Sequence, residues 1–213
     1  MTVAYIVANS IGAGNRITGV ANTDYAILQD VTVGSTDTNG FISTLSHRIV
    51  VEGTLMGDAT GIFSGADNTE TSVSVGRDGL VLGNEVAGLL TAGNLTVTNY
   101  GRIASLGGDG ITAIGNDRFY LTNYGSIEGG GASFGDGIVL DTMEAGAVVI
   151  NYGVISSGDR QADAFSFAYL GASVGQDQVW NYGTMIGQID LGGGNDYYDG
   201  SRGEIINVGT GGR

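Results

Sequence analysis

The sequence contains no cysteine, no proline and no lysine, and its single histidine is His47. Without cysteine there is no disulfide framework and no thiol nucleophile, so packing, hydrogen bonds or a metal ion must hold the fold. One histidine without cysteine also excludes a Cys–His dyad and a zinc site built from several histidines. We expect His47, beside Arg48, to lie on the exposed surface of a strand.

The charge of the chain is strongly one-sided. Eight basic residues, all arginine, stand against 22 acidic residues, and the formal net charge is −14. Such a surface repels nucleic acid and attracts divalent cations, so we expect no nucleic-acid partner. The opening segment MTVAYIVANSIGAGNR lacks the basic start of a signal peptide and the length of a membrane span. We therefore expect no transmembrane segment.

Glycine is abundant, with 40 residues, yet no Gly-X-Y period is present and 42% of the chain is hydrophobic. This combination excludes collagen and argues against disorder. Each glycine inside a helix costs about 1 kcal/mol relative to alanine, so glycines this frequent disfavour helices. The composition therefore predicts an all-β protein with many turns.

An internal repeat is the strongest feature of the sequence. The tripeptide Asn-Tyr-Gly begins at Asn99, Asn123, Asn151 and Asn181, with spacings of 24, 28 and 30 residues. An aliphatic residue stands two positions before each asparagine, and an apolar residue stands four positions after it. The first set is Val97, Leu121, Val149 and Val179, and the second is Ile103, Ile127, Ile155 and Met185.

Repeats of this length, with short apolar runs separated by glycine, are typical of one coil of a parallel β-helix. Coils stacked about 4.8 Å apart would make a rod of roughly eight coils approaching 40 Å. The preference of parallel crossovers predicts a right-handed solenoid with about 22–30 residues per coil. We expect one domain over residues 1–213, with less regular coils over 1–48 and recognisable repeats over 49–209.

The repeated tripeptide has a structural interpretation. An inward asparagine at a turn can donate its amide to the backbone and to the asparagine of the next coil, which predicts a ladder. The glycine that follows is expected to adopt positive φ. The tyrosines would stack in a column, for which we favour turn packing over a platform for sugar rings. The ladder residues are Asn99, Asn123, Asn151 and Asn181, and the column is Tyr100, Tyr124, Tyr152 and Tyr182.

A second repeated position carries aspartate. Asp109, Asp136 and Asp163 are separated by 27 residues each, within GDGI, GDGI and ADAF. Carboxylates one strand apart repel one another unless they are solvated or bridged by a cation. Because aspartate before glycine is an ordinary turn residue, we expect this column to face solvent.

The segment IDLGGGNDYYDG, from Ile189 to Gly200, resembles the haemolysin-type calcium-binding (RTX) family, whose nonapeptide is GGxGxDxUx. Gly192, Gly194 and Asp196 match the motif, and Tyr198 stands at its apolar position. The resemblance implies a Ca²⁺ site of glycine carbonyls and the aspartate carboxylate, which Asp190 and Asp199 would complete. Only one nonapeptide is present, so one chain supplies half a site. The repeats also resemble the passenger regions of large bacterial secreted β-helix proteins.

No catalytic constellation stands out in the sequence. A β-helix lyase or hydrolase needs a carboxylate pair, or Ca²⁺ with a basic residue, and Arg102, Arg118 and Arg160 belong to no such cluster. We therefore expect a non-enzymatic structural or adhesive solenoid, secreted or on a bacterial surface, with a carbohydrate or surface ligand. The alternative is a carbohydrate-active β-helix enzyme or spike. An ice-binding face would need a regular Thr-x-Thr array, which only Thr96 and Thr98 provide beside a repeat.

The ends of the predicted solenoid bear on its partners. Terminal coils expose unpaired backbone groups, and native proteins usually cover such edges with a helix or charges. Neither end of this sequence offers an amphipathic helix, and no proline interrupts a strand. We therefore expect self-association through the terminal coils.

Overall fold

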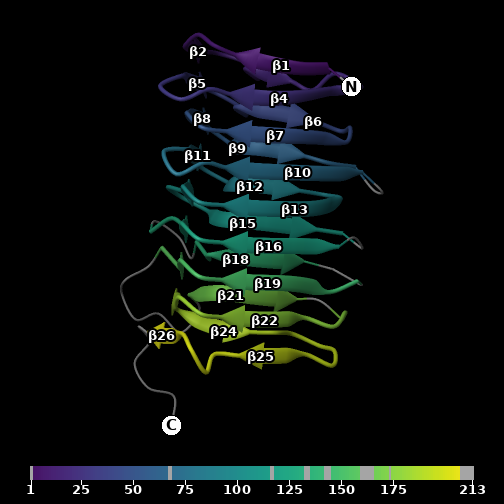
Figure 1. Cartoon of the computed structure of the whole chain (residues 1–213), viewed down its shortest axis with the longest axis vertical. Helices are drawn as coiled ribbons and strands as arrows, with labels where there is room; N and C mark the ends of the chain where they lie inside the picture. Colours follow the sequence, from purple (N-terminus) through teal and green to yellow (C-terminus); the bar gives the residue numbers. More distant parts are fainter. Residues whose placement is uncertain are drawn as a thin grey trace.

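The structure is a computed structural model that describes residues 2–66, 69–115, 118–131, 135–141, 145–158, 166–172 and 174–206. These residues form a β-solenoid of about eight turns with about 24 residues per coil, built from three parallel sheets (Figure 1). No helix occurs in the described ranges, so none there has the length and apolarity to cross a membrane. The predicted all-β parallel solenoid is confirmed.

Each coil contributes one strand to each sheet in turn. Sheet A contains β1 (Thr2–Ile6), β4 (Thr23–Ile27), β7 (His47–Val51), β10 (Glu70–Val75), β13 (Asn94–Asn99), β16 (Phe119–Asn123), β19 (Ala147–Asn151), β22 (Gln178–Asn181) and β25 (Tyr197–Asp199). Sheet B contains β2 (Ser10–Gly12), β5 (Thr32–Ser35), β8 (Thr54–Gly57), β11 (Leu80–Gly83), β14 (Arg102–Ser105), β17 (Ser126–Glu128), β20 (Val154–Ser156), β23 (Thr184–Ile186) and β26 (Glu204–Ile206). Sheet C contains β3 (Ile17–Thr18), β6 (Phe41–Ser43), β9 (Thr60–Ser64), β12 (Ala87–Thr91), β15 (Asp109–Ile114), β18 (Ile138–Asp141), β21 (Phe167–Ala172) and β24 (Gln188–Asp190).

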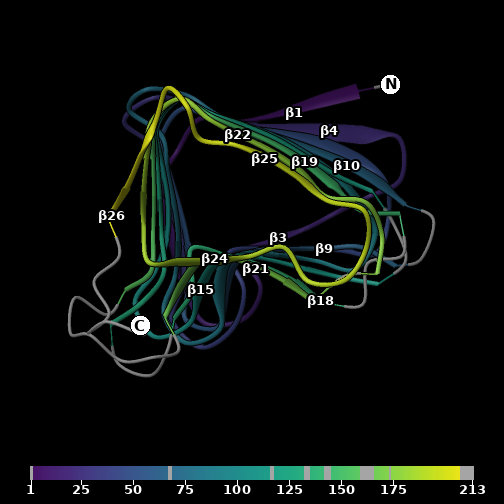
Figure 2. The ribbon, with the colours of Figure 1, turned by 90° about the horizontal axis from the view of Figure 1, so that it is seen from below.

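The three sheets enclose one interior. In Figure 2, which views the solenoid from below, the chain passes from sheet A to B to C counter-clockwise while it advances toward the viewer. This sense makes the solenoid right-handed, as expected for parallel crossovers. Strands β1 to β6 pair in the same three sheets as the later repeats, so the solenoid begins before residue 49.

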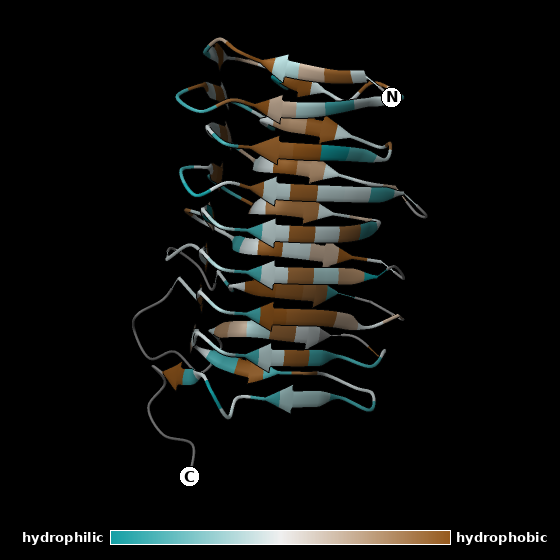
Figure 3. Cartoon of the chain, in the orientation of Figure 1, coloured by the Kyte–Doolittle hydropathy of each residue, from teal (hydrophilic) through white to brown (hydrophobic). Residues whose placement is uncertain are grey.

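Inward side chains form the hydrophobic core. Along the strands of sheet A, apolar and polar residues alternate, which appears as bands in Figure 3. This alternation points every second side chain inward. The apolar residues that flank the asparagines in the sequence all line the core, and each is at most 2% exposed. They are Val97, Leu121, Val149, Val179, Ile103, Ile127, Ile155 and Met185.

The four asparagines are fully buried and form a ladder along the corner between sheets A and B. Asn99 Nδ2 donates to Asn123 Oδ1 at 2.8 Å, Asn123 Nδ2 to Asn151 Oδ1 at 2.9 Å, and Asn151 Nδ2 to Asn181 Oδ1 at 2.8 Å. Each amide also donates to a backbone carbonyl just after the turn of the next coil. These acceptors are Ser126, Val154, Thr184 and Glu204. The ladder therefore ties the corner between sheets A and B in each of these four coils to the coil that follows.

The ladder has an unsatisfied first acceptor. Asn99 Oδ1 is buried and has no hydrogen-bond partner. The residue paired with Asn99 in the preceding coil is Val75, which offers no side-chain donor. The asparagine column thus begins at Asn99, where it replaces the aliphatic residues of the earlier coils.

The glycines of the tripeptide serve close packing, and the expectation that they adopt positive φ is wrong. Positive φ occurs at other glycines, such as Gly65 and Gly115. A β-carbon on Gly125 would overlap the carbonyl oxygen of Gly101, and one on Gly153 would overlap that of Gly125. Glycine is required here because the backbones of successive coils approach more closely than a side chain allows.

Candidate ligand-binding face

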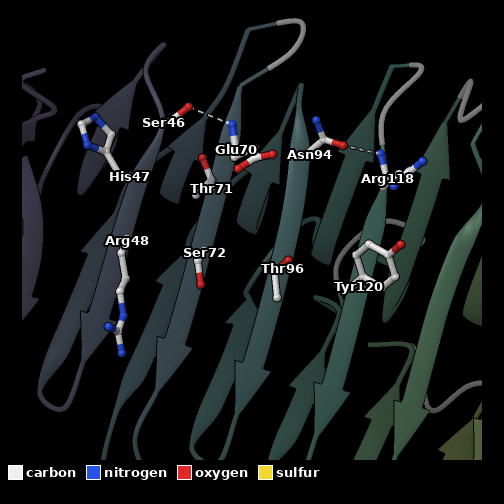
Figure 4. A pocket seen from close by; sticks show the side chains of 10 residues that line it. All are labelled: Ser46, His47, Arg48, Glu70, Thr71, Ser72, Asn94, Thr96, Arg118 and Tyr120. Carbon is white, nitrogen blue, oxygen red and sulfur yellow. Dashed lines mark hydrogen bonds between the residues drawn. The ribbon is translucent and has the colours of Figure 1, made fainter. Parts of the chain in front are cut away.

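The outer face of sheet A is hollowed by a groove of about 490 Å³ that crosses strands β7, β10, β13 and β16 (Figure 4). We call it the sheet A groove. Its lining residues are four with aliphatic hydroxyls, one asparagine, two arginines, one glutamate, one histidine and one tyrosine. They are Ser46, His47, Arg48, Glu70, Thr71, Ser72, Asn94, Thr96, Arg118 and Tyr120.

Strand register explains the hollow. Arg48 pairs with Ser72, Ser72 with Thr96, and Thr96 with Tyr120, so these four side chains form one outward row. Two short side chains therefore lie between two long ones, which leaves a depression between Arg48 and Tyr120. Thr96 has serine and tyrosine as its neighbours in this row, so the regular threonine array of an ice-binding face is not formed there.

Side-chain acceptors hold the strand starts that border the groove. Ser46 Oγ accepts from the Glu70 amide at 2.9 Å, and Asn94 Oδ1 accepts from the Arg118 amide at 3.0 Å (Figure 4). Both bonds link residues 24 positions apart, one coil from the next. They fix the positions from which the Glu70 and Arg118 side chains leave the backbone.

The groove is part of a longer trough along sheet A. A second hollow of about 340 Å³ shares Arg48, and apolar residues such as Val3 and Tyr5 line it together with Asp24 and Glu52. A third, of about 180 Å³, shares Arg118 and Tyr120 and extends to Gln178. The trough therefore follows the solenoid axis from β1 to β22 and is suited to an extended ligand.

The electrostatics of the groove differ from those of the whole chain. Glu70 is the one carboxylate among its lining residues, beside Arg48 and Arg118. Between described residues the one ion pair joins Arg102 to Glu128, at 2.6 Å on sheet B. The two groove guanidinium groups thus have no carboxylate partner within the described part of the chain. They are the positive groups of this face.

His47 borders the groove from inside the core, so the prediction of a surface histidine is wrong. Its side chain is buried, with Nδ1 2.7 Å from the Thr23 carbonyl and Nε2 2.6 Å from Ser43 Oγ. The rings of Tyr25 and Phe41 pack edge-on against it. These contacts place His47 in an inward position of β7, where a hydrogen-bonded imidazole fills a gap in the aromatic packing.

The tyrosine column lies at the corner that the asparagine ladder supports. Its four rings stack in parallel, with centroids 4.8, 5.0 and 5.1 Å apart. Tyr100, Tyr124 and Tyr152 are nearly half exposed. Because neighbouring tyrosines cover each other's faces, the interior of the column offers ring edges and hydroxyls to solvent. A sugar ring has access to a free face only at the two ends of the column.

The aspartate column is buried in part, which corrects the prediction that it faces solvent. Asp136 is 6% exposed, and its Oδ1 accepts from the Phe167 amide at 2.7 Å. Asp109 Oδ1 likewise accepts from the Asp136 amide at 3.0 Å. The register of β18 and β21, extended back by two residues, places Phe167 opposite Asp136. Asp163 lies outside the described residues.

Burial raises the pKa of Asp136 to about 6, with the nearby Asp109 carboxylate adding to the rise and the Phe167 amide opposing it. Burial also raises the pKa of Asp109. Since the folded-state pKa lies above the unfolded value, the native protein binds more protons between about pH 4 and 6. The free energy of unfolding should therefore increase as the pH falls from 7 to 4.

We expect the titration of Asp136 to add about 1 kcal/mol to the free energy of unfolding, after the contact of the Asp109–Asp136 pair with solvent is allowed for. Denaturant unfolding at a series of pH values measures it. The matched variant is Asp136→Asn, which keeps an acceptor for the Phe167 amide but cannot ionise, and its profile should be flatter in this window. Superimposable profiles for the two proteins would show that Asp136 titrates normally.

Asp177 is a buried carboxylate that the repeat pattern did not reveal. It is fully buried, and its Oδ1 accepts from the Ala147 amide at 2.9 Å while Oδ2 accepts from the Tyr169 hydroxyl at 2.8 Å. Burial, with the negative charge of Asp177, raises the pKa of Tyr169. The Tyr169–Asp177 hydrogen bond links sheet C to sheet A at the corner between them. Neither residue belongs to a repeat that is visible in the sequence.

The candidate calcium residues lie in the last coil around a glycine turn. Gly192 and Gly194 have φ of 74° and 137°. The carboxylates of Asp190, Asp196 and Asp199 each accept from a backbone amide. Their donors are Gly192, Asp177 and Ser201, at 2.9, 3.0 and 3.0 Å. No group of three or more acidic or histidine side chains in the described ranges is placed to hold a metal ion.

Weak calcium binding by this segment stays a prediction, and the binding should strengthen if the terminal coil of a second copy supplies further oxygens. Millimolar Ca²⁺ should raise the melting temperature. A Ca²⁺ concentration ten times the Kd would add about 1.4 kcal/mol to the free energy of unfolding. In Asp196→Asn this response should vanish, since the amide keeps an acceptor for the Asp177 amide but loses the charge. A response of equal size in both proteins would place calcium elsewhere.

Comparison of this chain with protein-family models, curated proteins and solved structures finds no match. The resemblance to the calcium nonapeptide therefore rests on residues 192–198 alone.

Proposed function

We propose that this chain is a non-enzymatic, adhesive β-solenoid that binds a polymeric carbohydrate along the outer face of sheet A, outside a bacterial cell. One observation carries the proposal: the trough along sheet A combines exposed aromatic rings with hydroxyl side chains in register. Sugar rings present apolar faces and polar edges, so binding sites for them combine these two kinds of side chain.

The aromatic residues of this face occupy its two outward rows. Tyr120 and Tyr197 lie in one row and are 43% and 48% exposed. Tyr5 and Trp180 lie in the other, and Tyr5 is 63% exposed. The rings of Trp180 and Tyr197 are 5.7 Å apart and tilted, so they do not cover each other's faces as the corner tyrosines do. Serines and threonines in the same two outward rows supply hydroxyl groups from strands β10, β13 and β16. They are Ser72, Ser74, Thr96, Thr98 and Thr122.

The composition of the groove favours binding over cleavage. Glycosidases use two carboxyl groups about 5 to 9.5 Å apart on either side of the scissile bond. Glu70 is the one carboxylate lining the sheet A groove. His47, the one histidine of the chain, has its two ring nitrogens in core hydrogen bonds. These features support a surface that holds a glycan without cutting it.

A glycan array followed by calorimetry tests the proposal. The parent should bind at least one extended polysaccharide, and Tyr120→Ala should weaken that binding at least tenfold. Tyr124→Ala is the matched control, because Tyr124 is as exposed as Tyr120 but belongs to the corner column. An equal loss of affinity in Tyr120→Ala and Tyr124→Ala would show that the polysaccharide does not bind specifically in the trough. Shortening of the bound polysaccharide on incubation would instead support a carbohydrate-active enzyme.

We also propose self-association through the terminal coils. Strands β1, β2 and β3 form one edge of the three sheets, and β25, β26 and β24 form the other. The first coil is rich in exposed apolar side chains, among them Val3, Tyr5, Val7 and Ile11. Sedimentation velocity should show concentration-dependent association that Ile11→Arg reduces. A monomer at every concentration would contradict the proposal.

A further inference from the structure

We infer that the ligand of the sheet A groove is a carboxylated glycan, a polymer of uronate-type sugars whose carboxylates pair with Arg48 and Arg118. The inference rests on the proposed function and names the class of its ligand. It comes from the two groove arginines, which glycan binding as such does not require.

The two arginines are spaced along the axis of the trough. Arg48 lies on β7, and Arg118 immediately precedes β16. These strands are three steps apart in sheet A, which corresponds to about 14 Å at the usual strand spacing. One strand step is close to the length of a sugar residue in an extended chain. A glycan aligned with the solenoid axis would therefore present its acidic groups in step with the coils.

Both guanidinium groups are free to bind a carboxylate. Neither forms an ion pair with another described residue, although acidic residues outnumber basic ones 22 to 8 in the chain. Asp24 accepts from the Arg48 backbone amide at 2.9 Å, and that bond holds the strand. In Figure 4 the Arg48 guanidinium points away from Glu70. A guanidinium fork matches a planar carboxylate in bidentate geometry, which gives specificity as well as binding energy.

The floor between the arginines suits sugar hydroxyls. Ser72 and Thr96 lie there, and Tyr120 closes the far side of the depression. An acidic peptide fits less well, because an extended peptide needs backbone partners from a sheet edge. Strands β7, β10, β13 and β16 are all interior strands of sheet A, with neighbours on both sides. A polynucleotide is disfavoured by the net charge of −14.

Glu70 adds a directional expectation. Its carboxylate shares the groove with the arginines and repels an anionic ligand, so Glu70→Gln should strengthen the binding of a carboxylated glycan. The affinity for a neutral glycan should not change in Glu70→Gln. The two responses distinguish charge pairing from general contact.

The test is calorimetry at 0.15 M salt with uronate hexamers of several linkages and with the neutral hexose hexamers of the same linkages. At least one uronate hexamer should bind the parent at least tenfold more tightly than its neutral counterpart. Arg48→Gln and Arg118→Gln should each remove most of that difference, and Glu70→Gln should increase it. The control is Arg102→Gln, which removes an exposed arginine on sheet B and should change nothing. Circular dichroism of each variant checks that the fold is retained.

The outcomes separate the inference from the proposed function. Equal binding of uronate and neutral hexamers would overturn the carboxylate inference and leave glycan binding standing. Binding of sulfated hexamers or of polyglutamate as tight as that of uronates would also overturn it, since charge alone would then suffice. Binding of no glycan of either kind would overturn both.

Discussion

Replacement of Asn123 by alanine is expected to lower the free energy of unfolding by about 2 to 4 kcal/mol, because it removes the centre of the buried asparagine ladder. The Asn123 amide donates to Asn151 Oδ1 at 2.9 Å and to the Val154 carbonyl at 3.1 Å, and its own Oδ1 accepts from Asn99 at 2.8 Å. The variant would leave buried groups in the preceding and the following coil without these partners. Urea unfolding monitored by circular dichroism measures the change.

Tyr124→Ala is the matched control for this prediction. Tyr124 is the next residue in the chain, but its side chain is 46% exposed and touches its neighbours through ring stacking. Its loss should cost about 1 kcal/mol or less, since stacked aromatic pairs contribute about 0.5 to 1.5 kcal/mol and exposure weakens them. If Tyr124→Ala proved the more damaging change, the ladder would not be what holds the corner.

The substitution Gly125→Ala should be at least as severe, at about 3 kcal/mol or more, and it should reduce the yield of folded protein. A β-carbon at this position would overlap the carbonyl oxygen of Gly101, and it would lie 2.8 Å from the Tyr100 carbonyl carbon. These are backbone atoms of the neighbouring coil, which cannot rotate away as a side chain does. Relief requires the coils to separate, which stretches the hydrogen bonds of two sheets.

Gly12→Ala provides the comparison at a glycine with space. Its β-carbon would meet the end of the Arg16 side chain at 3.3 Å, which moves at little cost. We expect a change within about 0.5 kcal/mol of the parent. Thermal unfolding of the two variants in parallel would show the contrast. Equal stability of Gly125→Ala and Gly12→Ala would contradict the close approach of coils at the tripeptide glycines.

Several features of the candidate site could not be predicted from the sequence. The ladder asparagines repeat because each meets an identical residue one coil away, and the same interaction selects the same residue every time. The groove residues do not repeat, since Arg48, Ser72, Thr96 and Tyr120 differ in every coil. A row of unlike residues shows no period, and it becomes visible only when strand register brings its members side by side.

Two of the wrong predictions, those for His47 and Asp136, share a physical cause. His47 and Asp136 are polar, so each was expected to face solvent, yet both are buried with their polar atoms hydrogen-bonded. Whether a polar residue can be buried depends on the partners that another coil supplies. Those partners are Thr23 for His47 and Phe167 for Asp136, at separations that vary with coil length.

The sequence by itself determined the architecture of this protein: an all-β parallel solenoid, its repeated corner, its asparagine ladder and its apolar interior. Each follows from alternation along a strand and from a period along the chain, which are local properties of the sequence. Only the tertiary structure decided which polar residues are buried, why the corner glycines are required, and where the outer face is hollow. These depend on distances between coils, because burial, steric overlap and grooves arise from residues that meet in space without any fixed spacing in the chain.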